Sequence, residues 1–377
     1  MKIDSLRNKI NNIDKKLLSL LEKRMQISTK IAKYKISNNK NIFDVNRENK
    51  IFKTIEDNST KKFLSSNHFL FSTIINTGKF LQYKKIKTLP KNIEKIINIS
   101  KNNTAQIDTA KLGCLEANDS YSNIAASKIF SNNNIINYTS LSDLFGDINK
   151  NIIDFGVFEI SNSNPPPINN IFDLINQHDV YIYKTINITP SYCLAVNSEN
   201  KNNFKKIIST SQILAQCSKY IKTHEYETST LNLASSAAFL VSTLDKTTAV
   251  ICPKEIALNN NLTIVEKDVQ NSTQANKKFA VISKKLYTTK NQNILSFSIK
   301  VKNINQFLIS VSSYFNINKI KLLQLQIKQS TNQNDAYTIY ISFIGNIKSQ
   351  SSISFINFLS QETNGFKLLG YYNEGNI

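Results

Sequence analysis

The most regular pattern of apolar and polar positions lies within the first forty residues of the chain. Apolar residues recur there at separations that alternate between four and three, and one arginine occupies a position in the series. The series comprises Leu6, Ile10, Ile13, Leu17, Leu20, Arg24, Ile27, Ile31 and Tyr34. Such spacing predicts a long helix with one buried face. Arg24 interrupts this face where the pattern calls for Leu or Ile.

Helical periodicity continues to about residue 85, and no clear strand interrupts it. The stretch "FDVNRE" opens a second helix with Asp44 as its N-cap, and "FSTIINTGKFLQ" lies on a third helix. The lysine-rich stretch that follows is polar and is interpreted as a linker. We therefore expect an all-α domain over residues 1–88 and a linker over residues 89–106.

Two further regions follow, with different patterns. From about Ile107, short apolar runs such as "TAVICP" alternate with helical stretches, which predicts an α/β domain over residues 107–287. The final block contains, in order, "ILSFSIKV", "INQFLISVSSYF", "IKLLQLQI" and "AYTIYISFIG". With the segments that close the chain, its predicted elements follow the order βαββαβ. This order is that of a small ferredoxin-like module, here over residues 292–377.

The chain is strongly basic, with a net charge of +20 and a pI near 9.6. Its lysines are spread along the whole chain and no groove-reading motif accompanies them, so no nucleic-acid partner is expected. No apolar run approaches the ~18 residues that span a bilayer, and "MKIDSLRNK" is not a secretory signal. The scattered Cys114, Cys193, Cys217 and Cys252 indicate a reducing compartment. We therefore expect a cytoplasmic protein with no membrane contact.

Arg24 admits two interpretations. Its stem could lie along the apolar face while its head reaches water. Alternatively, the guanidinium lies inside a helical bundle and needs an anion, because burying it unpaired costs several kcal/mol. Lys35 lies 11 residues further on, nearly on the same face and about 16 Å along the helix axis. The other polar candidates are Asp44, Arg47, Glu48 and Gln82, and Gly78 lies one turn before Gln82. This set suits a small polyanion that also carries a hydroxyl group.

The segments "LRNKINNIDKKLLSLLEKRMQISTKIAKYK" and "FDVNRENKI" resemble the all-helical chorismate mutases. The similarity is greatest to the N-terminal part of the bifunctional chorismate mutase/prephenate dehydratases and covers the first 85 residues. It implies that Arg24 binds a carboxylate of chorismate. It also implies that Lys35 and Gln82 donate hydrogen bonds to the ether oxygen of the C–O bond that breaks.

The resemblance assigns the remaining candidates to the same site. Glu48 and the backbone around Asp44 would hold the ring hydroxyl, and Arg47 would complete the positive wall. Gly78 stands where the family commonly has a serine. The implied reaction is a concerted rearrangement that needs charge stabilisation but no nucleophile or proton transfer. No cofactor and no metal are therefore expected.

Arg7 matches another carboxylate-binding arginine of the family. It lies 17 residues from Arg24, or about 25 Å along a continuous helix. Two arginine side chains cannot close that gap around one small molecule. We therefore expect a homodimer with antiparallel long helices, in which Arg7 serves the site of the second subunit.

The middle region resembles the prephenate dehydratases in several motifs. The matching residues are Leu112, Gly113, Ser120, Tyr121, Ser122, Asn162, Ser163, Asn169, Asp173, Leu174, Gln212, Gln216, Ser235 and Ser236. The resemblance implies a two-lobed α/β domain whose candidate site residues are Ser120, Ser122, Asn162 and Gln212.

The family's catalytic Thr-Arg-Phe motif has changed in this chain. Lys277 and Lys278 precede Phe279, and Thr273 lies six residues before Phe279. The hydroxyl that would protonate the leaving oxygen is missing, and lysine is not an equivalent anion clamp. Two interpretations stay open. In one, the chain rearranges chorismate and also converts prephenate to phenylpyruvate; in the other, it is a mutase with an eroded dehydratase domain. We favour the first.

The final βαββαβ block resembles the ACT domain, which implies feedback inhibition by phenylalanine. "KLLGYY" matches the closing strand of that domain, whereas "NQFLIS" and "LLQLQIKQS" replace its two ligand-binding motifs. We therefore expect weak or absent phenylalanine binding. Two functions of other classes are possible for a basic helical chain, an RNA-binding protein and a structural dimeriser. The first needs clustered cations with aromatic platforms, and the second leaves the polar candidates unexplained.

Overall fold

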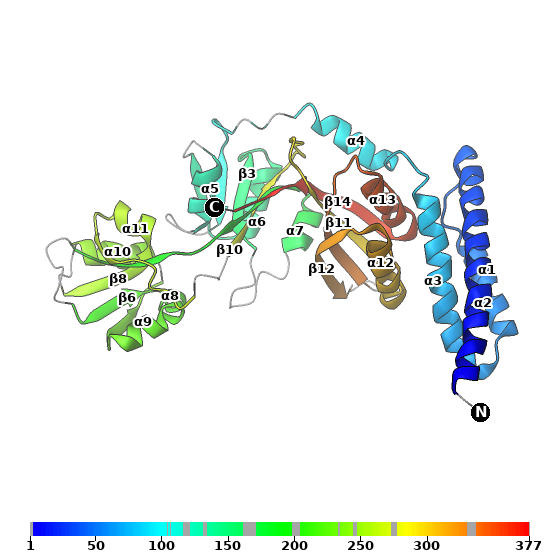
Figure 1. Ribbon diagram of the computed structural model, residues 1–377. Coiled ribbons are helices and arrows are strands. Elements are labelled where there is room, and N and C mark those ends of the chain that lie inside the picture. Colours follow the sequence, from blue (N-terminus) through cyan, green and yellow to red (C-terminus); the bar gives the residue numbers. More distant parts are fainter. Residues whose placement is uncertain are drawn as a thin grey trace. The chain divides into compact units, whose positions relative to one another are not determined.

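Figure 1 shows the computed structural model of the chain. It describes residues 3–103, 105, 107–115, 121–130, 134–160, 171–197, 204–232, 234–243, 247–272, 277–329 and 337–376. The chain forms two compact units. The first combines residues 1–102 with 288–371, and the second combines residues 103–287 with 372–377. Among the described residues, no helix is long and apolar enough to cross a membrane.

The first unit begins with the predicted helices. These are α1 (Ile3–Ser37), α2 (Val45–Asn58), the short 3-10 helix η1 (Lys61–Phe63), α3 (Leu64–Tyr83) and α4 (Lys91–Ser100). The predicted N-cap of α2 is confirmed, since the Asp44 side chain accepts a hydrogen bond from the Arg47 backbone N–H at 3.0 Å. Helix α4 occupies much of the stretch expected to be a linker.

The rest of the first unit has the predicted order βαββαβ. Its elements are β11 (Ile294–Val301), α12 (Ile304–Asn318), β12 (Lys321–Gln329), β13 (Tyr337–Ile344), α13 (Gln350–Glu362) and β14 (Asn364–Tyr372). The strands lie in the order β12-β13-β11-β14, and β13 is antiparallel to both β11 and β12. This is a ferredoxin-like arrangement. We refer to it below as the C-terminal segment.

Aromatic side chains join the C-terminal segment to α3. The fully buried Phe80 ring lies 4.7 Å from the Tyr314 ring of α12 and 5.5 Å from the Phe358 ring of α13, centroid to centroid. Asn76 of α3 also donates a hydrogen bond to the Ser310 hydroxyl at 2.9 Å. The three helices α3, α12 and α13 therefore share one core.

The second unit has two lobes, each with its own sheet. The first sheet has the order β4-β10-β3-β1-β2, with β15 beside β4, and the second has the order β7-β6-β8-β5-β9. The strands of the first lobe are β1 (Leu112–Leu115), β2 (Ile135–Tyr138), β3 (Phe155–Glu159), β4 (Tyr181–Ile188), β10 (Lys277–Ser283) and β15 (Glu374–Asn376). Its helices are α5 (Tyr121–Ile129), α6 (Leu141–Asn149) and α7 (Ile171–Gln177).

The second lobe lies between β4 and β10 in the sequence. Its strands are β5 (Tyr192–Val196), β6 (Lys206–Ser209), β7 (Glu227–Thr230), β8 (Thr248–Pro253) and β9 (Thr263–Glu266). Its helices are α8 (Ser211–Gln216), α9 (Ser218–Thr223), α10 (Ala234–Thr243) and α11 (Lys254–Asn259). The predicted two-lobed α/β architecture is thus confirmed.

The apolar face of α1 is not covered within the chain itself. The helix has the predicted length, but its apolar face is exposed: Leu6 is 40% exposed, Ile10 57% and Leu20 62%. The residues of α1 that are buried are Ser28 and Ala32, which face α3. Periodicity identifies an apolar face, whereas burial depends on which neighbour covers it.

Replacing Phe80 with alanine tests the shared core. Removing a fully buried ring leaves a cavity, so we expect the free energy of unfolding of the first unit to fall by about 3–5 kcal/mol. Phe239 of α10 is 58% exposed, and its replacement with alanine should change stability by less than about 0.5 kcal/mol. Urea unfolding followed by far-ultraviolet circular dichroism measures both. Equal midpoints for the two variants would contradict the role given to Phe80.

Candidate active site

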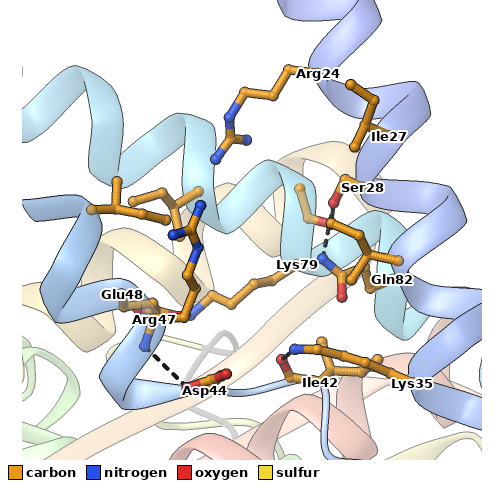
Figure 2. Close-up of a pocket in the computed structure, with 14 residues that line it drawn as sticks. Arg24, Ile27, Ser28, Lys35, Ile42, Asp44, Arg47, Glu48, Lys79 and Gln82 are labelled. Carbon is orange, nitrogen blue, oxygen red and sulfur yellow. Dashed lines mark hydrogen bonds and ion pairs between the residues drawn. The ribbon is translucent and has the colours of Figure 1, made fainter.

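A cavity of about 400 Å³ lies among α1, α2 and α3 (Figure 2). Its lining consists of Arg24, Ile27, Ser28, Ile31, Lys35, Ile42, Asp44, Arg47, Glu48, Ile51, Ile75, Gly78, Lys79 and Gln82. Six of the seven residues predicted for the mutase site are in this set. The structure therefore brings together side chains from three helices. The sequence alone could assign each side chain to a helix, but it could not show that the three helices meet.

Arg24 is half-buried and belongs to the cavity wall. Its Nη1 donates a hydrogen bond to the Ile74 carbonyl of α3 at 3.1 Å. Figure 2 shows its guanidinium and that of Arg47 turned toward one another. Burial lowers the pKa of Arg24, and the charge of Arg47 lowers it further. Among the described residues, neither guanidinium forms an ion pair with a carboxylate, so this wall of the cavity is positive.

Lys35 and Gln82 are each fixed by one hydrogen bond. Lys35 Nζ donates to the Ile42 carbonyl at 2.5 Å. Gln82 Nε2 donates to the Ser28 hydroxyl at 2.9 Å, and that hydroxyl donates to the Gly78 carbonyl at 3.0 Å. Burial lowers the pKa of Lys35, although the nearby carboxylates of Asp44 and Glu48 act in the opposite direction. Both side chains keep further N–H donors for a ligand.

Gly78 leaves room for Arg24 and Ser28. A Cβ at this position would stand 3.1 Å from Ser28 Oγ and 3.2 Å from Arg24 Nη1, which is tight for both neighbours. The hydroxyl that the resemblance places at position 78 is absent, but the Ser28 hydroxyl of α1 lies beside the same spot. Sequence reasoning missed Ser28, whose position one turn after Arg24 was the available signal.

Glu48 has a partner that the sequence did not suggest. Lys79 Nζ lies 2.9 Å from Glu48 Oε1, and the two side chains are 9% and 12% exposed. Lys79 also lies 5.1 Å from the centre of the Phe43 ring. A lysine within the apolar stretch "TGKFLQ" of α3 was the only signal for this ion pair.

Arg7 does not reach this cavity. It lies near the start of α1, forms an exposed ion pair with Asp4 at 3.4 Å, and its side chain is 67% exposed. Its position agrees with the helix-length argument that it cannot serve the site of its own chain.

The dehydratase-like candidates are only partly described. Ser122 is buried in α5, and Gln212 is exposed in the first turn of α8, while Ser120 and Asn162 lie outside the described residues, as does Thr273. The Tyr121 ring lies 6.2 Å from the Tyr192 ring of β5, centroid to centroid. Tyr121 therefore connects α5 of one lobe to β5 of the other.

Lys277 and Lys278 form separate ion pairs. Lys277 Nζ lies 3.0 Å from Glu159 Oε2 and 5.1 Å from the centre of the Tyr121 ring. Lys278 pairs with Glu374 of β15. The Lys277 ammonium is thus held between the Glu159 carboxylate and the Tyr121 ring of α5.

Comparisons with known proteins agree with this architecture. The family model of chorismate mutase type II matches residues 6–83, and that of prephenate dehydratase matches residues 112–286. A bifunctional chorismate mutase/prephenate dehydratase of Buchnera aphidicola subsp. Schizaphis graminum is 28% identical over 387 aligned positions, which cover 99% of this chain and 97% of that protein.

Solved structures of prephenate dehydratases share the fold of most of this chain. The prephenate dehydratase of Staphylococcus aureus has a TM-score of 0.61 at 20% identity and covers 70% of this chain and 100% of its own. That of Arthrobacter aurescens, solved in complex with L-Phe, has a TM-score of 0.60 at 15% identity and covers 70% and 89%. The chain thus combines a type II chorismate mutase domain with a prephenate dehydratase domain. It belongs to the family of bifunctional chorismate mutase/prephenate dehydratases.

Proposed function

We propose that this chain rearranges chorismate to prephenate in the cavity among α1, α2 and α3, and converts prephenate to phenylpyruvate in its α/β unit. The two reactions are consecutive steps of phenylalanine biosynthesis, and we place them in the cytoplasm. One observation carries the proposal. Six residues predicted for the mutase site from three separate helices line a single cavity with a positive wall.

The cavity suits a dicarboxylic ether. We assign the carboxylates of chorismate to Arg24 and Arg47, because a dianion offsets the repulsion between these two cations. Lys35 and Gln82 donate their remaining N–H groups to the ether oxygen, on which negative charge develops as the C–O bond breaks. The lining holds the compact conformer in place, so the rearrangement proceeds without a nucleophile.

We further propose that the mutase site is completed by a second copy of the chain. The exposed apolar face of α1 supports this, since a contiguous apolar face is typical of an interaction surface. In an antiparallel pair of α1 helices, this face would be covered and Arg7 would approach the cavity of the partner.

The second proposed reaction is the conversion of prephenate to phenylpyruvate in the α/β unit. Expelling the ring hydroxyl together with CO₂ requires a proton donor at the leaving oxygen. Lys277 is the ionisable residue at the matching position, and we propose it as the donor. The alternative is a mutase with an inactive α/β unit. The match of the prephenate dehydratase family model to residues 112–286 favours the bifunctional interpretation over that alternative.

We propose that the C-terminal segment is an ACT domain that binds phenylalanine weakly or not at all. The Arthrobacter dehydratase was solved with L-Phe. In this chain, the stretches that replace the two ligand-binding motifs lie on α12 and β12, and they lack the glycine, acidic and arginine residues that would recognise an amino acid.

Replacing Arg24 with alanine tests the mutase site. Losing a charge-assisted contact to a substrate carboxylate should lower kcat/KM for chorismate by about 10- to 100-fold. Lys23→Ala, which removes a neighbouring exposed cation, should leave kcat/KM unchanged. Chorismate depletion measures both variants, and unchanged turnover in a folded Arg24→Ala protein would refute the assignment.

Mixing two impaired variants tests the shared site. In a dimer formed from one Arg7→Ala chain and one Arg24→Ala chain, one of the two sites retains both arginines. Random mixing should therefore recover about a quarter of wild-type activity, because about half of the dimers are mixed and each has one intact site. No recovery after mixing would show that Arg7 does not act across subunits.

Adding prephenate to the purified protein tests the second reaction. We expect phenylpyruvate to form, and the Arg24→Ala protein should form it at the same rate because its α/β unit is unchanged. Lys277→Met should abolish product formation, since the proposed proton donor is gone. A wild-type protein that consumes chorismate but yields no phenylpyruvate would leave the mutase as the only activity.

A further inference from the structure

Three buried charged residues lie in a row behind the mutase cavity. Lys79 Nζ is 2.9 Å from Glu48 Oε1 and 2.5 Å from Glu362 Oε2, and the three side chains are between 9% and 12% exposed. Glu48 and Lys79 belong to the helical domain. Glu362 is the last residue of α13 in the C-terminal segment. Glu362 therefore contacts Lys79, the direct partner of the cavity residue Glu48.

The central lysine depends on both carboxylates. Burial by itself lowers the pKa of Lys79, but the charges of Glu362 and Glu48 outweigh this effect and raise it. Lys79 is consequently an ammonium at neutral pH, shared between the two acids. Without Glu362, it would be a buried cation paired with Glu48 alone, and it would neutralise the carboxylate that the cavity presents to a ligand.

The residue next to Glu362 reaches the other side of the same cavity. Gln361 Oε1 accepts a hydrogen bond from the Ile42 backbone N–H at 2.8 Å. The carbonyl of Ile42 in turn accepts the hydrogen bond from Lys35 Nζ. Gln361 and Glu362 thus each hold a group that orients a cavity residue, Lys35 in one case and Glu48 in the other.

All three residues also line a second cavity. This cavity of about 440 Å³ lies between the helical domain and the C-terminal segment, and Glu48, Lys79 and Glu362 are part of its lining. Glu48 and Lys79 line the mutase cavity as well. The two cavities therefore share Glu48 and Lys79 as wall residues, and Glu362 contacts this shared wall.

We propose that Glu362 is a positioning residue for the chorismate reaction, which acts through Lys79 to orient the Glu48 carboxylate toward the ring hydroxyl of the substrate. The C-terminal segment is then a structural part of the mutase site. This inference rests on the proposed mutase function. It assigns to Glu362 no contact with the substrate.

The test compares Glu362→Gln with the wild type in the full chain. Glu48 would hold the ring hydroxyl equally in the ground and transition states, so its misplacement should raise KM for chorismate about tenfold and change kcat by less than about twofold. Glu374→Gln removes another C-terminal carboxylate, one that pairs with Lys278, and should leave both constants unchanged. An unchanged KM in folded Glu362→Gln would overturn the proposal.

Two further measurements separate positioning from a general loss of structure. Two bicyclic ether dicarboxylates that differ only in one ring hydroxyl should bind wild type with different affinities in calorimetry. Glu362→Gln should weaken only the hydroxylated one. Equal weakening of both would overturn the proposal.

In a Lys79→Leu background, Glu362→Gln should have no further effect on KM, because Lys79 no longer connects Glu362 to Glu48. A full additional effect there would also overturn it.

If Glu362→Gln does not fold, Glu362→Asp serves in its place. It keeps the charge but shortens the reach by one methylene, so KM should rise by an intermediate factor, and an unchanged KM would overturn the proposal. The measurements also distinguish failure of this inference from failure of the proposed function. A wild-type protein without chorismate turnover removes that function together with this inference, whereas active wild type with unaffected variants removes only the inference.

Discussion

Repulsion between cations at one end of a small cavity is the interaction on which the rest of the site depends. Arg24 and Arg47 face one another, and burial and proximity both lower the pKa of Arg24. Holding two guanidinium groups together without an anion costs free energy that folding must supply. In the proposed function, a dicarboxylic ligand would recover this free energy on binding. The two cations would then be arranged for a dianion before it binds, which is the condition for electrostatic catalysis.

Much of this site could be predicted because its signals are local. The interruption of a regular apolar series identified Arg24, and the rise per residue of a helix excluded Arg7 from the same cavity. Asp44 was recognisable as an N-cap from its side chain and its place before "VNRE". Each of these inferences concerns a single helix, whose geometry is fixed by backbone hydrogen bonds and does not depend on the rest of the chain.

The rest could not be predicted because it depends on contacts between distant segments. Lys79 and Glu362 are 283 positions apart, and no periodicity relates them. The same limit applies to the apolar face of α1. An apolar series indicates that one face of a helix is buried, but it does not indicate which element or subunit covers that face. Within one chain, α3 covers the narrow stripe of Ser28 and Ala32 instead.

The packing of α13 against α3 gives the C-terminal segment a structural role in the first unit. Phe80, Tyr314 and Phe358 form a dry aromatic core that fixes the end of α13, and with it Gln361 and Glu362, beside the mutase cavity. Such a contact requires only shape and two polar side chains, so it does not depend on the recognition of an amino acid. The C-terminal segment therefore has a structural role in the first unit whether or not it binds a ligand.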